Sequence, residues 1–516
     1  MAEPFYLTTP LYYVNAKPHL GHAYTTVIAD TLARWHRQRG DDVFLLTGTD
    51  EHGEKIALAA QADGLSPKEF VDKTSETFRS LWKTLGISYD HFIRTTDPAH
   101  VKAVQRALEK LKPHLTLGKY TFWYCVPCET NYGLAEIDPA KPVCKTCGRP
   151  VSQVEEEDYF LPLEKHRGWL KEQILKNEGF ILPKARRNEV LGMLEDPLPP
   201  LCVTRPKSRV PWGIAVPFSE LKGEYVAYVW FDALLNYISA LGWPDNPNFE
   251  KFWNKAGAIH FIGKDILRHH ALYWPIILHC LDIKPPKMIF AHGWWLIKGE
   301  KMSKSKGNIV EPEAVVAAYG LDAFRYFLLR DVPLGDDGVF SEESFVKRIN
   351  ADLANDLGNL VYRTLTMIEK HAGGKIPQGR VDAVFTQEID KVQAKIADAL
   401  LLTGIAPSEA LRAIWDLIGS TNLLVEKTAP WTLAKEGKRQ ELEAFLYRMA
   451  ESLRVITVLL WPFLPGTAES IWKQLGFDTD LSKERLPEVL EKRIPAGQSI
   501  RKGAPLFPRI DLKEAK

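Results

Sequence analysis

The chain has almost no net charge. Its 66 lysines and arginines are balanced by 65 acidic residues, which leaves a formal charge of +1 over 516 residues. A strongly basic balance would by itself indicate a nucleic-acid partner. Without one, any contact with RNA must come from a local patch, about which the composition says nothing.

Long apolar runs and a targeting segment are also missing. The longest uncharged stretches, such as 455–468, contain prolines and are shorter than the roughly 18 residues that a membrane span needs. The first residues, MAEP, have neither a basic start nor an apolar core, so they do not predict a secretory leader. We therefore expect a cytoplasmic protein with no membrane partner.

Cysteine is scarce, and most of it is paired. Four of the six cysteines form the pairs Cys125-x-x-Cys128 and Cys144-x-x-Cys147, with 15 residues between them. A secreted disulfide framework would be denser, whereas two such pairs at this spacing are typical of a zinc knuckle. We predict one structural zinc ion held by these four thiolates. The alternative is two redox pairs or idle thiols.

The first residues predict an α/β domain. Residues 5–8 are strand-like, a helical pattern runs from Leu20 to Arg39 and stops at Gly40, and a second apolar run follows at 43–46. Strand, helix and strand at this spacing predict a parallel unit that binds ligands at the carboxyl ends of its strands.

The rest of the chain indicates that the α/β domain is interrupted once and is followed by an all-α region. The cysteine pairs and several prolines lie between 116 and 229, strand-like runs resume at 225–230, 258–262 and 288–291, and from 345 on apolar residues recur only at helical spacing. We predict a doubly wound parallel, Rossmann-like catalytic domain, split by a zinc-knuckle insertion and followed by an all-α helical bundle. The predicted parts are the first half of the catalytic domain at 1–115, the connective insertion at 116–229, the second half at 230–293, a stem region with a lysine-rich loop at 294–344, and the bundle at 345–516.

Two short motifs have the composition of a phosphate site. His19-Leu20-Gly21-His22 lies where a loop meets the first helix, and a helix N-terminus attracts phosphate through its N–H groups and dipole. Gly21 leaves room for a flat ring against the backbone. The stretch 301–307, KMSKSKG, offers mobile ammonium groups to a polyphosphate. Taken alone, the first motif is more often a pair of solvated or capping histidines, and the second a solvated basic loop.

Together the two motifs are far more specific. About 280 positions separate them, and both are predicted at the carboxyl edge of one sheet. In this order they resemble the two signature sequences of the class I aminoacyl-tRNA synthetases. The closer resemblance, over essentially the whole chain, is to the methionyl-tRNA synthetase family. It is carried by further stretches at 11–15 (LYYVN), 48–53 (GTDEHG), 228–233 (YVWFDA), 261–265 (FIGKD) and 505–510 (PLFPRI).

The resemblance implies an activity and its partners. It implies an enzyme that activates L-methionine with ATP to methionyl-adenylate and then transfers the methionyl group to the 3′ end of tRNA(Met) for translation. Mg²⁺ would accompany ATP, and zinc would occupy the knuckle. Such a reaction needs no protein nucleophile, because the methionine carboxylate attacks the α-phosphate. The protein must hold the reactants in line and neutralise the growing negative charge.

The resemblance also implies which residues form the site. The negative charge that grows during the reaction would be stabilised by His19, His22, Lys301 and Lys304. The ATP site would include these residues together with Gly21, Lys264, Asp265, Gly293 and Ser303. The methionine site would be lined by Leu11, Tyr13, Asp50, Trp230, Ala233, Tyr237 and His270.

Physical reasoning supports parts of that set. A methionine pocket needs aromatic faces for the thioether and one carboxylate for the ammonium group, which Asp50 at a strand end can supply. Asp265 can accept hydrogen bonds from a ribose or, equally, cap the next helix. Trp230 and Tyr237, taken alone, are more simply core residues. His269 departs from the aromatic residue of bacterial relatives, which leaves the fine shape of the pocket open.

Three residues of the helical region could contact RNA. Asn359 and Arg363 lie four apart on one helix face, and Trp431 follows Pro430 at a helix start. Such side chains can hydrogen-bond to unpaired bases and stack on them, although a core tryptophan and a surface arginine are the commoner explanation. The resemblance implies that these three residues contact the methionine anticodon.

Rival functions fit less well. The related synthetases for leucine, isoleucine and valine carry a much larger insertion, and the cysteine enzyme needs an open zinc position that four cysteines would close. A plain nucleotidyltransferase would not need the C-terminal helices, and the lysine loop argues against a non-catalytic RNA-binding zinc protein. The chain ends at Lys516 without a further domain, so we expect a monomer.

Overall fold

The computed structural model describes residues 2–15, 17–126, 128–297, 299–301, 310–401 and 404–511, and for Glu156, Glu300 and Lys301 the backbone only. The chain divides into two compact units. The first, here called the sheet unit, comprises Glu3–Pro18 and Val43–His292. The second, called the helical unit, comprises Met1–Ala2, His19–Asp42 and Gly293–Lys516.

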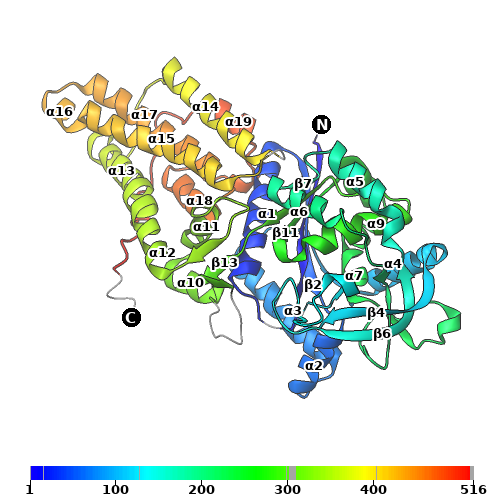
Figure 1. Cartoon of the computed structure of the whole chain (residues 1–516). Coiled ribbons are helices and arrows are strands. Elements are labelled where there is room, and N and C mark those ends of the chain that lie inside the picture. The colour runs from blue at the N-terminus through cyan, green and yellow to red at the C-terminus, as the bar shows by residue number, and fades with distance from the viewer. Residues whose placement is uncertain are drawn as a thin grey trace. The chain divides into compact units, whose positions relative to one another are not determined.

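A six-stranded sheet forms the centre of the sheet unit (Figure 1). Its order is β3 (His91–Arg94), β2 (Asp42–Asp50), β1 (Pro4–Tyr13), β11 (Ala258–Gly263), β12 (Met288–His292) and β7 (Ile181–Leu182). The pairs β2–β3, β1–β11, β11–β12 and β12–β7 are parallel. The strand order reverses between β1 and β11, and in such sheets ligands bind beyond the carboxyl ends of the strands at this switch point.

The sequences of these strands explain their place. β11 (AIHFIG) and β12 (MIFAH) are almost continuously apolar, and nearly every residue in them is buried, as expected for parallel strands covered on both faces. The core of the unit extends from the sheet into the surrounding helices. The α-helices of the unit are α2 (Glu54–Ala62), α3 (Pro67–Thr84), α4 (Pro98–Leu111), α5 (Arg167–Lys176), α6 (Lys184–Met193), α7 (Val229–Leu234), α8 (Asn236–Ser239) and α9 (Trp274–Cys280).

The insertion has its own sheet. In it β5 (Thr130–Tyr132), β4 (Thr116–Cys125), β6 (Ser152–Leu161) and β8 (Leu201–Cys202) lie side by side and antiparallel, and Figure 1 shows β4 and β6 as its long strands. A small separate core of Cys125, Tyr132, Ile137, Cys144 and Val151 lies beside it. Two further strands, β9 (Thr204–Pro206) and β10 (Tyr225–Ala227), pair antiparallel.

The helical unit begins with α1 (Leu20–Arg39), which Gly40 ends in the left-handed conformation at φ 96°. The predicted bounds of this helix are confirmed. The strands of the unit are β13 (Trp295–Ile297), β14 (Glu300–Lys301) and β15 (Gly338–Phe340). Its other helices are α10 (Pro312–Tyr319), α11 (Leu321–Arg330), α12 (Glu342–Arg348), the π-helical η9 (Ile349–Gly358), α13 (Asn359–Ala372), α14 (Ala383–Leu400), α15 (Pro407–Thr428), α16 (Pro430–Lys435), α17 (Arg439–Leu460), α18 (Pro465–Gln474) and α19 (Leu486–Glu491).

Helices alone form the part of this unit after β15, as the sequence predicts for the residues that the structure describes there. Helices α14, α15 and α17 pack side by side, as Figure 1 shows. The parallel sheet domain followed by a helical region confirms the predicted fold class.

One strand prediction was wrong. The run 225–230 was expected to resume the parallel sheet, but β10 stops at Ala227 and pairs antiparallel with β9, and α7 begins at Val229. Aromatic and β-branched residues fit a strand or a buried helix equally well. Here the Asp232 N–H bonds the Tyr228 carbonyl at 2.9 Å, which starts a helix.

Candidate functional site

The two histidines of the first motif begin helix α1. His19 caps the helix, and its Nδ1 accepts the Gly21 N–H at 3.1 Å. His22 Nδ1 accepts the His19 N–H at 3.1 Å, which closes a reciprocal capping box. The rings stack with their centroids 3.8 Å apart. Because both Nδ1 atoms accept, each neutral ring carries its proton on Nε2 and can donate it.

The charge state of this pair follows from its environment. Burial, and after it the neighbouring His19, lower the pKa of His22 well below its ordinary value, so His22 is neutral at pH 7. A Cβ at Gly21 would lie 3.0 Å from His19 Cε1. The flat ring that Gly21 accommodates in this structure is therefore the imidazole of His19.

The lysine motif is described only at its first residue. The backbone of Lys301 pairs with Leu296 in β13, whereas Ser303 and Lys304 lie in 302–309, outside the described residues. Val310, the first described residue after them, accepts the Leu20 N–H through its carbonyl at 3.2 Å. The chain that follows the lysine motif is thus hydrogen-bonded to the histidine motif.

The other residues predicted for ATP lie at strand ends. Lys264 and Asp265 form a 3₁₀ turn directly after β11. A Cβ at Gly263 would lie 2.6 Å from Asp265 Oδ1, so glycine allows Asp265 to fold back over the strand end. In the helical unit a Cβ at Gly293 would lie 2.1 Å from the carbonyl oxygen of Asp336. Gly293 therefore has a packing role of its own.

Asp50 ends β2 and is 6% exposed. Among the described residues, its Oδ1 atom has no hydrogen-bond partner. Burial, and then the nearby Asp232 and Glu129 carboxylates, raise the pKa of Asp50 well above its ordinary value. A buried carboxylate in such surroundings is stabilised by a bound cation, and the α-ammonium group of an amino acid meets that requirement.

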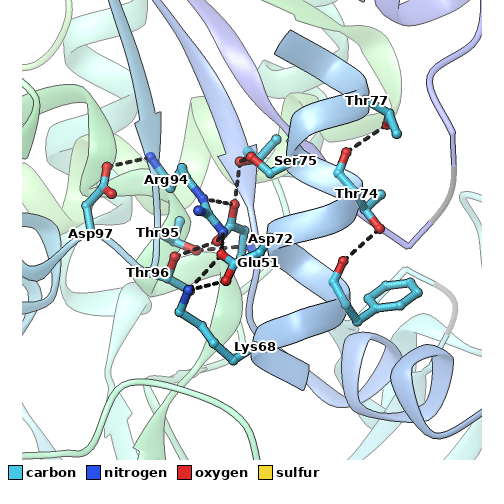
Figure 2. Close-up of polar contacts among 12 residues, drawn as sticks. Glu51, Lys68, Asp72, Thr74, Ser75, Thr77, Arg94, Thr95, Thr96 and Asp97 are labelled. Atoms are coloured by element: carbon cyan, nitrogen blue, oxygen red, sulfur yellow. Dashed lines mark hydrogen bonds and ion pairs between the residues drawn. The ribbon is translucent and has the colours of Figure 1, made fainter. Parts of the chain in front are cut away.

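Glu51, which follows Asp50 in the chain, is held by a hydrogen-bond network of its own. The carboxylate of Glu51 is fully buried and receives two hydrogen bonds from Arg94, at 2.7 and 2.9 Å. Thr49 and Thr96 donate to the same carboxylate at 2.7 and 2.5 Å. Arg94 also donates to Asp72 at 2.6 Å, and Figure 2 shows Arg94 between Glu51 and Asp72. This network fixes the backbone on which Asp50 is carried.

Aromatic residues form one wall of the predicted methionine pocket. Tyr237 is 1% exposed, and its hydroxyl lies 2.8 Å from His270 Nε2. The other ring nitrogen of His270 lies 3.0 Å from the Ile266 carbonyl. Burial lowers the pKa of His270 to about 4, so the ring is neutral at pH 7. His260 stacks on Tyr237 at 4.0 Å and extends the wall inward.

Trp230, another predicted pocket residue, belongs to a stacked pair. It is partly exposed and lies parallel to His269, with the ring centroids 3.8 Å apart and an interplanar angle of 19°. Burial, and then His270 and Arg268, lower the pKa of His269 well below its ordinary value. His269 is therefore a neutral flat ring against Trp230.

The remaining predicted pocket residues also lie in the sheet unit. Leu11, Tyr13 and Trp230 are partly buried against its core, and Ala233 is buried. The Tyr13 hydroxyl lies 3.0 Å from both the His52 carbonyl and a Glu129 carboxylate oxygen.

Sequence reasoning missed a buried polar group next to this pocket. Asp232 lies 2.7 Å from His52 Nδ1 and 2.7 Å from His100 Nε2. Burial opposes ionisation, yet the two histidines lower the pKa of Asp232 below its ordinary value. A signal existed for two members, because His52 and Asp232 fall within the stretches GTDEHG and YVWFDA that resemble the family. His100 had none.

The four paired cysteines form one cluster. Their sulfur atoms all lie within 4.8 Å of one another, and the closest approaches are 3.6 Å for Cys125–Cys147 and 3.8 Å for Cys128–Cys144. Four thiolates around zinc at about 2.3 Å place neighbouring sulfurs roughly 3.8 Å apart. Donor type and spacing both fit a closed metal site, which favours a structural ion over two redox pairs.

The knuckle makes a testable prediction. Replacing the buried Cys144 with serine is expected to reduce bound zinc from one ion per chain to a small fraction, because a hydroxyl is a poor substitute for a thiolate ligand. Metal analysis of the purified protein measures this. The control is Cys280→Ser, a buried thiol away from the cluster. Equal zinc in both variants would contradict the assignment.

The three residues predicted to contact RNA are at the surface. Asn359 and Arg363 are exposed on the first turns of α13. Trp431, in α16, is 51% exposed, so it is not a core tryptophan. Ala429 precedes α16 at φ 46° and turns the chain out of α15.

Among the described residues, every helix is too short or too polar to span a bilayer.

Family models match nearly the whole chain. Residues 5–365 match the model described as tRNA synthetases class I (M), and residues 378–516 match the anticodon binding domain of methionyl tRNA ligase. A methionine–tRNA ligase of Caldanaerobacter subterraneus subsp. tengcongensis is 45% identical, with 100% of this chain and 80% of the relative covered. That of Thermotoga maritima is 43% identical, with 99% and 81% covered.

Solved structures agree with the sequence relatives. Mycobacterium tuberculosis methionyl-tRNA synthetase in complex with methionyl-adenylate superimposes with a TM-score of 0.92 at 37% identity, over 98% of this chain and 100% of the other. Its unliganded form gives 0.85 at 33% identity, over 99% of each chain. Two family models in sequence, relatives along the full length and a shared fold leave one conclusion: the chain belongs to the methionyl-tRNA synthetase family of class I aminoacyl-tRNA synthetases.

Proposed function

We propose that this chain activates L-methionine with ATP to methionyl-adenylate and transfers the methionyl group to the 3′ end of tRNA(Met) in translation. The observation that carries the proposal is Asp50, a buried carboxylate without a hydrogen-bonded partner for Oδ1 among the described residues, at the carboxyl end of β2. Aromatic walls suited to a thioether stand in the same unit.

In the first step, different residues bind the ammonium group and the side chain of methionine. Asp50 binds the ammonium group of methionine, while Tyr13, Trp230, Tyr237 and His270 enclose its side chain, with Leu11 and Ala233 giving the apolar floor. The carboxylate of methionine then attacks the α-phosphate of ATP, and pyrophosphate leaves. Holding the two reactants in line contributes roughly 7–11 kcal/mol to such a step.

Groups of the two motifs stabilise the negative charge that grows during this step. His19 and His22 donate from Nε2, and Lys301 and Lys304 supply ammonium groups that follow the leaving pyrophosphate. Lys264 and Asp265 hold the adenosine, with Gly21, Gly293 and Ser303 completing the ATP site. Mg²⁺ accompanies ATP, bound mainly by phosphates and water.

The remaining parts serve structure and tRNA. Cys125, Cys128, Cys144 and Cys147 hold one structural zinc ion in the connective insertion, 116–229. The bundle, 345–516, binds the tRNA anticodon, where Asn359 and Arg363 hydrogen-bond and Trp431 stacks on unpaired bases. The catalytic domain takes 1–115 and 230–293, with 294–344 as the stem. The protein acts in the cytoplasm as a monomer.

The proposal is tested by ATP–pyrophosphate exchange with single amino acids, followed by charging of tRNA(Met). Methionine is expected to support exchange, and leucine, isoleucine, valine and cysteine to support far less. The methionyl group should then appear on tRNA(Met). Exchange that depends on another amino acid, or on none, would refute the proposal.

A further inference from the structure

Three consecutive residues of the zinc insertion contact aromatic residues at the predicted methionine pocket. The carbonyl of Cys128 accepts the Trp230 indole N–H at 3.3 Å and the Thr130 hydroxyl at 3.0 Å. The Thr130 hydroxyl also lies 3.4 Å from His269 Nε2. Between them, Glu129 contacts Tyr13. No local sequence pattern indicates these contacts.

Glu129 is buried in an uncommon backbone conformation. It is 3% exposed and has φ 48°, in the left-handed region that is unfavourable for a non-glycine residue. Its main-chain carbonyl accepts the Tyr228 hydroxyl, and its N–H reaches the Val126 carbonyl at 3.3 Å. The surrounding residues therefore hold the turn in place and direct the carboxylate inward.

The carboxylate of Glu129 meets the predicted pocket residue Tyr13. The Tyr13 hydroxyl has one proton and lies 3.0 Å from two acceptors, Glu129 Oε1 and the His52 carbonyl. The chain makes room for this contact at Gly53, which has φ 110°. A Cβ there would lie 2.7 Å from the Tyr13 oxygen and 2.9 Å from Glu129 Oε1.

The same carboxylate also acts on Asp50. The charges of Asp232 and Glu129 raise the pKa of Asp50. Burial raises the pKa of Glu129 itself, and the nearby Lys55 opposes that rise. Lys55 lies 5.0 Å from the ring of Tyr13, on the amino-terminal turn of α2. The contact between the Tyr13 hydroxyl and Glu129 orients the ring.

We propose that Glu129 is a positioning residue for methionine: its carboxylate fixes the Tyr13 ring, so that the zinc insertion takes part in binding the amino acid. The proposal rests on the function proposed above. It assigns Glu129 a role in substrate affinity, distinct from holding the knuckle together.

The test compares Glu129→Ala, Glu129→Gln and Tyr13→Phe in the full-length enzyme. Glu129→Ala should raise the KM for methionine in pyrophosphate exchange about 10- to 100-fold, the effect of losing a hydrogen bond to a charged group. The KM for ATP should change less than about twofold. Glu129→Gln keeps an oxygen acceptor for Tyr13, so it should recover much of the loss.

Two measurements distinguish a positioning role of Glu129 from a purely structural one: its energetic coupling to Tyr13 and the zinc content. The double variant Glu129→Ala/Tyr13→Phe should have a methionine KM no higher than that of the more impaired single variant, because both substitutions remove the same interaction. Zinc content should stay at one per chain in all of them. Asp138→Ala, an exposed acid of the same insertion that accepts the Ala140 N–H, should behave as wild type.

Two results would overturn the inference. One is a methionine KM within about twofold of wild type in Glu129→Ala. The other is a loss that falls equally on both substrates, comes with loss of zinc and is additive with Tyr13→Phe. In either case normal methionine-dependent exchange by the wild type would leave the proposed function standing, and only its absence there would refute that function.

Discussion

Replacing His22 with alanine should slow methionine-dependent ATP–pyrophosphate exchange by about 10²- to 10³-fold, the effect of removing one preorganised donor to a developing charge. His22 is neutral and accepts the His19 N–H at Nδ1, so the donor is its Nε2–H. The group is set in place before reaction by helix α1, which spares it reorganisation in the transition state. Single-turnover formation of adenylate measures the rate directly.

The control must separate the donor from the helix cap. His22→Gln keeps a side-chain acceptor at the position that closes a capping box, so its stability should equal that of wild type. Its amide replaces the imidazole donor only in part, and a smaller rate loss is expected. If His22→Ala forms adenylate at the wild-type rate, His22 has no part in the chemistry.

Replacing Asp50 with asparagine should weaken methionine binding about 10²- to 10³-fold, because the ammonium group loses its buried ionic partner. The affinity for ATP should hardly change. The exposed Asp63→Asn, just after α2, serves as the matched control. Titration calorimetry with methionine measures the effect, and an affinity within a few-fold of wild type would remove Asp50 from the site.

The same change should stabilise the unliganded protein. The pKa of Asp50 is raised in the folded state, so the folded chain binds its proton more tightly than the unfolded chain does. Its ionisation therefore destabilises the fold increasingly as the pH rises from about 4 to the raised pKa. Asp50→Asn removes this penalty, so its gain in unfolding free energy should vanish near pH 4 and grow as the pH rises above it.

Local patterns predicted local features well. Helix α1 runs from Leu20 to Arg39 as its periodicity and Gly40 indicate, and the cysteine spacing predicted the four-sulfur cluster. Both depend on residues close together in the chain. Val310, which follows the lysine motif, bonds to Leu20 of the histidine motif. Ser303 and Lys304 lie outside the described residues, so the convergence of the two motifs stays a prediction.

Features set by tertiary contacts were beyond local patterns. The sixth strand of the parallel sheet, Ile181–Leu182, has two residues and lies inside the insertion, too short for any periodicity. The contacts of Asp232 with His100 and of Glu129 with Tyr13 join positions more than a hundred residues apart. They exist because the insertion and the parallel sheet fold as one unit, which composition and spacing do not encode.

The most direct test of the account is a crystal structure with bound methionyl-adenylate. The account predicts that an Asp50 oxygen lies about 3 Å from the α-ammonium group, that the thioether lies between Trp230 and Tyr237, and that His22 Nε2 faces the α-phosphate. An ammonium group bound elsewhere, with Asp50 facing no cation, would contradict it.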